Sequence, residues 1–182
     1  MAAVGRRRVQ HALRLPLSAR ENVAGGRPAT DEVLDRAARD AGAADVVGRF
    51  PGGWATPLSR EFTGGADLSG GEWQRLALAR ALAGLEAGAR VLVLDEPTAH
   101  LDVRAEAELY DHFLRLTRGR TTILVSHRFS TVRRADRIAV IEGGRVVEQG
   151  SHDELLAARG RYATMFTLQA SRFAEAEDEV VQ

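Results

Sequence analysis

Two short apolar runs in the second half of the sequence constrain the fold most. The first, "RVLVLDEP", begins at Arg90, and the second, "TTILVSH", begins at Thr121. Short continuous apolar runs are typical of strands that are buried on both faces of a parallel sheet. The stretch between them, from about Arg104 to Leu116, has a helical pattern. The order strand, helix, strand therefore predicts an α/β fold.

The remaining segments predict a helical half followed by this α/β half, without an internal repeat. Up to about Pro28 the chain looks irregular, and helices are expected over 31–43 and 71–88 with a loop-rich stretch between them. After "TTILVSH" we expect a short helix in "RFSTVRRAD" and a hairpin in "DRIAVIEGGRVVEQG". "SHDELLAARGRYATMFTLQ" opens with a capping box and predicts one C-terminal helix, followed by a frayed acidic tail.

Polar residues follow both predicted strands at the edge where parallel strands end. Asp95 stands where a group that holds Mg²⁺, directly or through water, is expected, and Glu96 is placed to orient and deprotonate an attacking water. The alternative is a plain turn with Asp95 as a cap. Ser126 and His127 end the next strand, so His127 would help to hold a γ-phosphate and the water in line, unless it is a structural hydrogen-bonding residue.

The stretch "DLSGGEWQR" places two glycines at the start of a helix. Ser69 and Glu72 have the spacing of a capping box, which alone would explain the pattern as an ordinary helix start. The same geometry directs the amides of Gly70, Gly71 and Glu72 outward at the positive end of the helix, beside the Ser69 hydroxyl. That arrangement is suited to a phosphate, and side chains at 70 and 71 would block its close approach.

Composition excludes several classes of site. The 25 basic and 25 acidic residues balance, which argues against nucleic-acid binding driven by bulk charge. There is no cysteine, so disulfides, thiolate metal sites and cysteine nucleophiles are excluded. No apolar run approaches the roughly 18 residues that span a bilayer, and we do not interpret the basic N-terminus as a signal peptide. All 25 basic residues are arginine.

Taken together, "LSGGEWQRLALARAL", "VLVLDEPTAHLD" and "ILVSHR" resemble the ATP-binding cassette of ABC transporters. The resemblance implies a signature motif at Leu68 to Gly71 and a Walker B motif at Val91 to Asp95, with Glu96 as catalytic base. It also implies a D-loop at Ala99 to Asp102 and a switch histidine at His127. The implied fold is an incomplete P-loop NTPase-like (RecA-like) parallel sheet core with an α-helical subdomain.

Further stretches resemble cassettes of the exporter type. "VQHALRLPLSARENVAGG" is similar to their Q-loop, which makes Gln10 a ligand of Mg²⁺ and of the water. The implied nucleotide-binding residues are Gln10, Leu68, Ser69, Gly70, Gly71, Glu72 and Asp102, with Asp95 and Gln10 at the metal. Two residues depart from the usual motifs: Glu72 stands where Gln is usual, and His100 where the D-loop commonly has a small residue.

One part of the family pattern is missing. The family holds its own ATP with a P-loop, Gly-x-x-x-x-Gly-Lys-Ser/Thr, upstream of the Q-loop, and this sequence contains no lysine. We therefore expect an N-terminally truncated cassette that hydrolyses ATP negligibly alone. An alternative is a non-catalytic half-cassette that gives its signature motif to a partner. The short stretch between Gln10 and Leu68 disfavours a DNA-repair-type cassette, which has long coiled coils inserted there.

The resemblance also implies an organisation and partners. We expect a Q-loop and signature subdomain at 1–88, the C-terminal part of the ATPase core at 89–165 and an acidic tail at 166–182. The expected ligands are ATP and Mg²⁺, and the expected partners are a second cassette, paired head to tail, and the transmembrane domains of an exporter, without nucleic acid. The chain would lie at the cytoplasmic face of the membrane, held there through those domains. The transported substrate is not readable from the sequence.

Overall fold

The computed structural model describes residues 14–96 and 113–180, with residues 172–180 as backbone only. The chain divides into two compact units, Met1–Val125 and Ser126–Gln182, and each is described by itself. None of the described helices is both long enough and apolar enough to cross a membrane.

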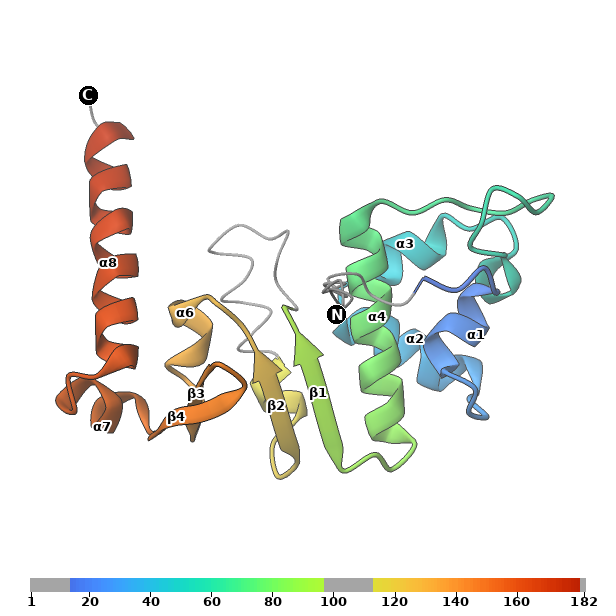
Figure 1. Cartoon of the computed structure of the whole chain (residues 1–182). Helices are drawn as coiled ribbons and strands as arrows, with labels where there is room; N and C mark the ends of the chain where they lie inside the picture. The colour runs from blue at the N-terminus through green and yellow to red at the C-terminus, as the bar shows by residue number, and fades with distance from the viewer. Residues whose placement is uncertain (1–13, 97–112, 181–182) are drawn as a thin grey trace, which may run out of the picture. The chain divides into compact units, whose positions relative to one another are not determined.

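The first unit contains a group of helices and a parallel strand pair (Figure 1). Its elements are α1 (Ala19–Ala24), α2 (Asp31–Asp40), α3 (Ala44–Gly48), the 3₁₀ turn η1 (Gly53–Ala55), α4 (Gly70–Glu86), β1 (Val91–Asp95) and β2 (Thr121–Val125). Helices α1 and α2 both pack against α4. This helical group corresponds to the expected α-helical subdomain.

The core of the first unit is built from small and branched apolar side chains. Leu34 of α2 and Ala79 of α4 are completely buried, and Val23 of α1 lies in the same cluster. Leu92 and Leu94 of β1 join this cluster too. The helices pack closely because so many contact positions are alanine, which lets their backbones approach.

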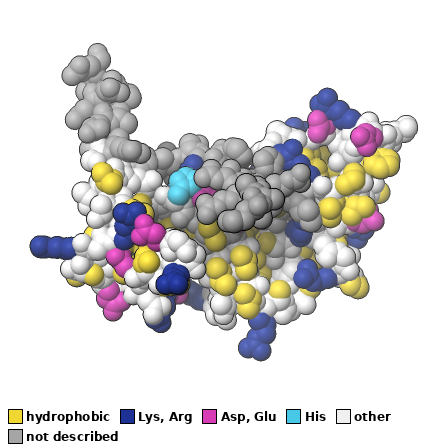
Figure 2. All heavy atoms as spheres, viewed as in Figure 1, with side chains coloured by type: hydrophobic (Ala, Val, Ile, Leu, Met, Phe, Trp, Pro, Cys, Tyr) yellow, Lys and Arg dark blue, Asp and Glu magenta, His cyan; other side chains and the backbone are white. Residues whose placement is uncertain are grey.

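Strands β1 and β2 pair in parallel, as expected, and end at the same edge. Asp95 is the register partner of Val125. The expectation that both faces of this sheet are buried is wrong for the described structure. Leu92 and Leu94 face the core, whereas Val93 is 61% exposed and Ile123 is 50% exposed. Figure 2 shows hydrophobic side chains at the surface in this area. Successive side chains point to opposite faces, and the buried cluster covers only one of them.

The second unit contains a hairpin and three helices. Its elements are α6 (Phe129–Val132), β3 (Ile138–Glu142), β4 (Arg145–Gly150), α7 (His152–Ala157) and α8 (Arg161–Val180). The predicted hairpin is confirmed: β3 and β4 are antiparallel, and Gly143 and Gly144 both have positive φ, as a tight turn of the favoured hand requires. Tyr162 is buried with Ile138, Val140 and Leu155 in the core of this unit.

The C-terminal region differs from the single helix that was predicted. The capping box of Ser151 and Glu154 does start α7, but that helix ends at Ala157 and α8 begins at Arg161. Arg159 has a φ of 52° at the break. Glu148 of β4 accepts hydrogen bonds from the backbone amides of Arg161 and Tyr162, so a side chain from the hairpin caps α8.

Candidate functional site: a phosphate-binding helix start and a strand end

The signature turn, residues Leu68 to Glu72, is the start of the 17-residue helix α4. Ser69 is the N-cap: its Oγ accepts a hydrogen bond from Glu72 N at 3.3 Å, and Ser69 N donates to Glu72 Oε2 at 2.7 Å. The predicted capping box is therefore confirmed. It fixes the direction of the first helical amides. Of the three amides expected to point outward, that of Glu72 is used inside the capping box, and the Ser69 hydroxyl also bonds the Glu72 carboxylate.

The second glycine of the turn is not required by the packing of the described residues around it. Gly70 is exposed, and a Cβ placed on Gly71 would meet no atom within 4 Å. Neither residue has the positive φ that favours glycine. Glycine near the start of a helix costs up to about 1 kcal/mol relative to alanine. The turn thus keeps an open helix start that its own fold does not need, which fits the close approach of a phosphate.

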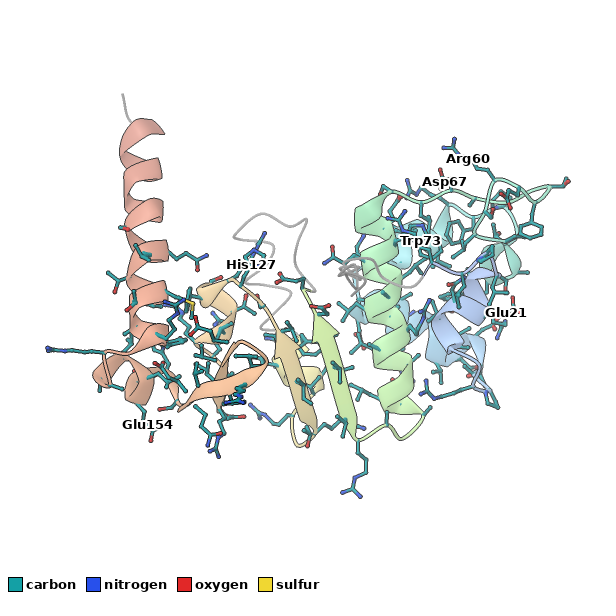
Figure 3. The ribbon with its side chains drawn as sticks, viewed as in Figure 1. Glu21, Arg60, Asp67, Trp73, His127 and Glu154 are labelled. Carbon is teal, nitrogen blue, oxygen red and sulfur yellow. The ribbon has the colours of Figure 1, made fainter. Side chains whose placement is uncertain are left out.

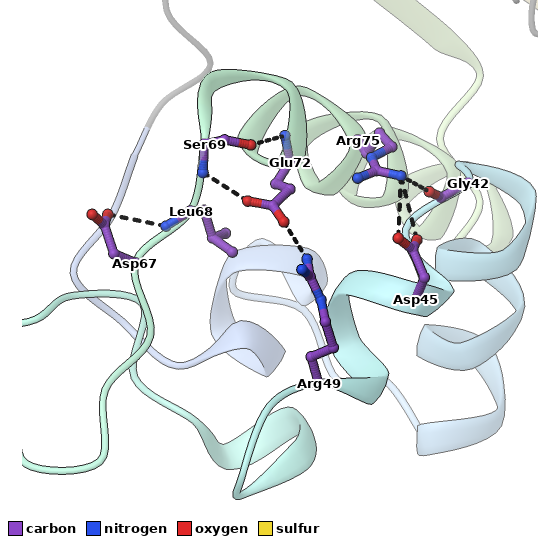
Figure 4. A network of polar contacts seen from close by, with 8 residues as sticks. All are labelled: Gly42, Asp45, Arg49, Asp67, Leu68, Ser69, Glu72 and Arg75. Carbon is purple, nitrogen blue, oxygen red and sulfur yellow. Dashed lines mark hydrogen bonds and ion pairs between the residues drawn. The ribbon is translucent and has the colours of Figure 1, made fainter.

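The charge at this turn comes from Glu72 and Arg49 (Figure 4). Hydrogen bonds from the backbone and the hydroxyl of Ser69, together with that from Arg49, lower the pKa of Glu72 from its usual 4.5 to about 2. The carboxylate is therefore ionised at neutral pH. The Arg49 guanidinium, at the C-terminal end of α3, forms an ion pair with Glu72 Oε1.

Buried neighbours anchor the turn on both sides. Leu68 is 7% exposed and Trp73 is 5% exposed. Leu68 N donates to Asp67 Oδ1 at 3.0 Å, and Asp67 forms an ion pair with Arg60 at 3.0 Å, a pair that Figure 3 labels beside the turn. Buried apolar side chains therefore hold the backbone of the signature turn in place.

Asp95 and Glu96 lie at the carboxyl end of β1, where the sequence predicted them. Asp95 is exposed and closes the strand. Glu96 has a φ of 49°, its N donates to Val125 O at 2.9 Å, and its carbonyl accepts from Gln74 Nε2 of α4 at 3.1 Å. The signature helix and the strand end are thus joined by a direct hydrogen bond within this unit.

The side chains near Asp95 show whether the expected Mg²⁺ could be bound there. In the ranges 14–96 and 113–180 no group of three or more His, Cys, Asp or Glu side chains is placed to hold a metal. Mg²⁺ usually keeps several waters and binds through one or two carboxylates and the phosphates of its substrate. An exposed single carboxylate such as Asp95 fits that pattern.

His127, which is labelled in Figure 3, belongs to the second unit, and its side chain is exposed. Its backbone carbonyl accepts from Gln169 Nε2 of α8 at 3.4 Å, and Gln169 Oε1 accepts from Phe129 N at 3.1 Å. Gln169 therefore holds the loop that carries His127. That His127 meets Asp95 and Glu96 stays a prediction.

Three other predictions lie outside the described residues: Gln10, the D-loop residues 99–102 and most of the helix expected from about 104 to 116, of which 113–116 is helical. Sequence reasoning missed two residues at the site, Arg49 and Gln74. Arg49 carries no local signal, because it lies 23 positions before Glu72 in a loop-rich stretch. Gln74 had a weak sequence signal, because it is a polar amide among mostly apolar positions of the helix.

Comparison with known proteins identifies the family. The profile described as ABC transporter matches residues 7–99. The chain belongs to the ABC transporter family. Both the expected resemblance and the expected fold class are confirmed.

Individual relatives agree with this assignment. The "ATP-dependent lipid A-core flippase" of Chromohalobacter salexigens is 45% identical over 157 residues, which cover 86% of this chain and 26% of the flippase. The "Mycobactin import ATP-binding/permease protein IrtA" of Mycolicibacterium smegmatis is 45% identical over 147 residues, 80% of this chain and 16% of that protein. The chain thus spans about a quarter of the flippase's length.

A solved structure is similar as well. A bacterial Atm1-family ABC exporter with ATP bound superposes with a TM-score of 0.75 at 38% sequence identity, covering 88% of this chain and 27% of the exporter chain. The fold of this chain is therefore similar to that of part of an exporter chain.

Proposed function

We propose that this chain is part of the ATP-binding cassette of an ABC exporter, and that its signature turn contacts the terminal phosphate of an ATP held by the P-loop of a second cassette. The observation that carries the proposal is the open helix start at Gly71, where a Cβ would meet none of the described residues within 4 Å. The amides of Gly70 and Gly71, at the positive end of α4, are suited to an anion.

The strand end serves a different nucleotide in this proposal. Glu96 orients and deprotonates the water that attacks a γ-phosphate, and His127 helps to hold that phosphate in line. Asp95 and Gln10 serve the same nucleotide as ligands of its Mg²⁺, and Asp102 is a further nucleotide-binding residue. When bound, Mg²⁺ supplies positive charge that offsets the phosphate oxygens. The hydrogen bond from Gln74 holds the Glu96 backbone in place.

Coupling to transport follows from the relatives, whose names include a lipid flippase and an import protein. We propose that the cassette works at the cytoplasmic face of a membrane, attached to transmembrane domains, and drives transport by ATP hydrolysis. The exporter assignment rests on the structural likeness.

A complementation assay tests the signature role. The 182-residue chain is added to a reporter cassette, a second ATP-binding cassette that has a P-loop lysine but whose own signature residues are replaced. We expect the chain to restore ATP hydrolysis by the reporter. Alone, the chain should stay at background, because it contains no lysine to serve in a P-loop.

The variant Gly71→Val should abolish this restoration, because its side chain fills the space above the helix start. The matched control is Gly48→Val, at another helical glycine where a Cβ would also meet nothing within 4 Å. Failure of the wild-type chain to restore hydrolysis, or full restoration by Gly71→Val, would contradict the proposed function.

A further inference from the structure

The signature turn contains a charge that opposes its proposed ligand. Glu72 lies at the helix start, and its carboxylate is held there by the amide of Ser69 at 2.7 Å. A phosphate at the same turn is also an anion, and like charges at short range repel. The helix dipole offers only about half a positive charge, so it cannot offset a full carboxylate and attract a phosphate as well.

Arg49 supplies the missing positive charge. Its Nη2 contacts Glu72 Oε1, on the carboxylate oxygen that Ser69 N does not use (Figure 4). The Glu72 side chain is 16% exposed, whereas that of Arg49 is 63% exposed. The Glu72 side chain therefore has little contact with solvent, whereas most of the Arg49 side chain lies at the surface.

We propose that Arg49 keeps the signature turn able to bind a phosphate by neutralising the carboxylate of Glu72. The inference rests on the proposed function, since it takes the partner-held γ-phosphate as the ligand. Arg49 acts through Glu72 and through its field at the turn, so it is a positioning residue of the nucleotide site.

A purely structural role explains less of what is observed. Ion pairs with an exposed partner contribute about 0–1 kcal/mol to stability. The capping box already fixes the helix start, and a second ion pair, Arg75 with Asp45 at 3.3 Å, already joins α3 to α4. The distinguishing feature of Arg49 is its place beside the turn, whereas Arg75 lies further along the helix.

Five variants of the chain separate the two roles in the reporter assay. We measure the chain concentration that gives half-maximal ATP hydrolysis, together with the maximal rate. Arg49→Gln should raise the half-activating concentration roughly tenfold, equivalent to about 1.4 kcal/mol, because it leaves the carboxylate unopposed. Arg49→Lys keeps the charge and should stay close to wild type.

The rescue experiment is the most informative. Glu72→Gln keeps the capping geometry, since Gln serves at this position of a capping box, but it removes the negative charge. It should lower the half-activating concentration, and the double variant Arg49→Gln/Glu72→Gln should return close to the wild-type value. The control Arg75→Gln breaks the other ion pair and should leave that value unchanged.

Salt provides an independent readout. The penalty of Arg49→Gln should shrink at 1 M salt, where the Debye length is about 3 Å. The inference would be overturned if the double variant had a half-activating concentration as high as that of Arg49→Gln, or if Arg75→Gln did. Because the wild-type chain and Gly71→Val test the proposed function separately, a failure here leaves that result intact.

Discussion

Glu72 connects folding and binding at a single residue. It closes the capping box with Ser69, pairs with Arg49 and lies beside the proposed phosphate. Its pKa, about 2, lies below the usual 4.5 because the folded protein stabilises the ionised form. Folding is therefore linked to the protonation of this group.

The acid stability of the chain should depend on Glu72. A lowered folded-state pKa gives stability that is complete above the unfolded value, and that is lost as pH falls through about 2. Near pH 6 we expect the free energy of unfolding of wild type to be about 1–2 kcal/mol higher than that of Glu72→Gln, after allowance for solvent screening. At pH 2 the two free energies should be almost equal. Urea unfolding at both pH values measures this difference. A gap that does not change with pH would rule out the linkage.

For individual residues, the sequence predicted the contacts between residues that are close together in the chain. The capping boxes at Ser69 and Ser151 follow from a spacing of three residues, and both are present. A third, Ser18 with Glu21, starts α1 and was missed, because the prolines and glycines around it made the segment look irregular. Arg49 was not predictable, because its partner Glu72 lies 23 positions away and is brought close by the tertiary fold.

Helix α4 is the element that joins the parts of the first unit. Besides the bond from Gln74 to Glu96, its Arg80 donates to the backbone carbonyl of Asn22 in α1 and to Asn22 Oδ1 at 2.9 Å. Asn22 is 1% exposed, and its Nδ2 donates to the carbonyls of Leu15, Leu17 and Ser18. Burial lowers the pKa of Arg80.

Loss of Asn22 should therefore cost much more than loss of an exposed pair. Asn22→Ala removes a buried amide that bonds three backbone carbonyls and accepts from Arg80, which should lower the free energy of unfolding by about 2–4 kcal/mol. The control Arg36→Ala removes the exposed ion pair with Glu86 that joins α2 to α4, and should cost at most about 1 kcal/mol. Chemical denaturation compares them. Equal losses would show that the buried network does not hold α1 to α4.

The break between α7 and α8 shows why an element boundary can escape sequence analysis. The pattern "LLAARGRYATMF" continues as a helix, yet Glu148 from β4 caps a new helix at Arg161. A Cβ on Gly160 would collide with Glu148 Oε1, so a side chain there would displace the carboxylate that caps α8. Such a contact has no local signal.

For the whole chain, the motifs predicted both the family and the α/β class, because each motif combines a backbone geometry with a chemistry. The burial of the sheet was not predicted correctly. Apolar runs cannot show which face a second layer covers, and Val91, Val93, Ile123 and Val125 are all about half exposed or more. The signature turn and the acids of β1 lie in one compact unit, and His127 lies in the other.

The central claim, that the signature turn contacts an ATP held by another cassette, can be tested by chemical labelling. The chain has no cysteine, so Ser69→Cys introduces a unique thiol at the turn. An ATP analogue with a thiol-reactive group on its γ-phosphate should label this cysteine only when the reporter cassette is present with its P-loop lysine intact. Ser130→Cys, at an exposed position of α6, should stay unlabelled under the same conditions. The account would be contradicted if Ser69→Cys were labelled without the reporter cassette, or if Ser130→Cys were labelled to the same extent.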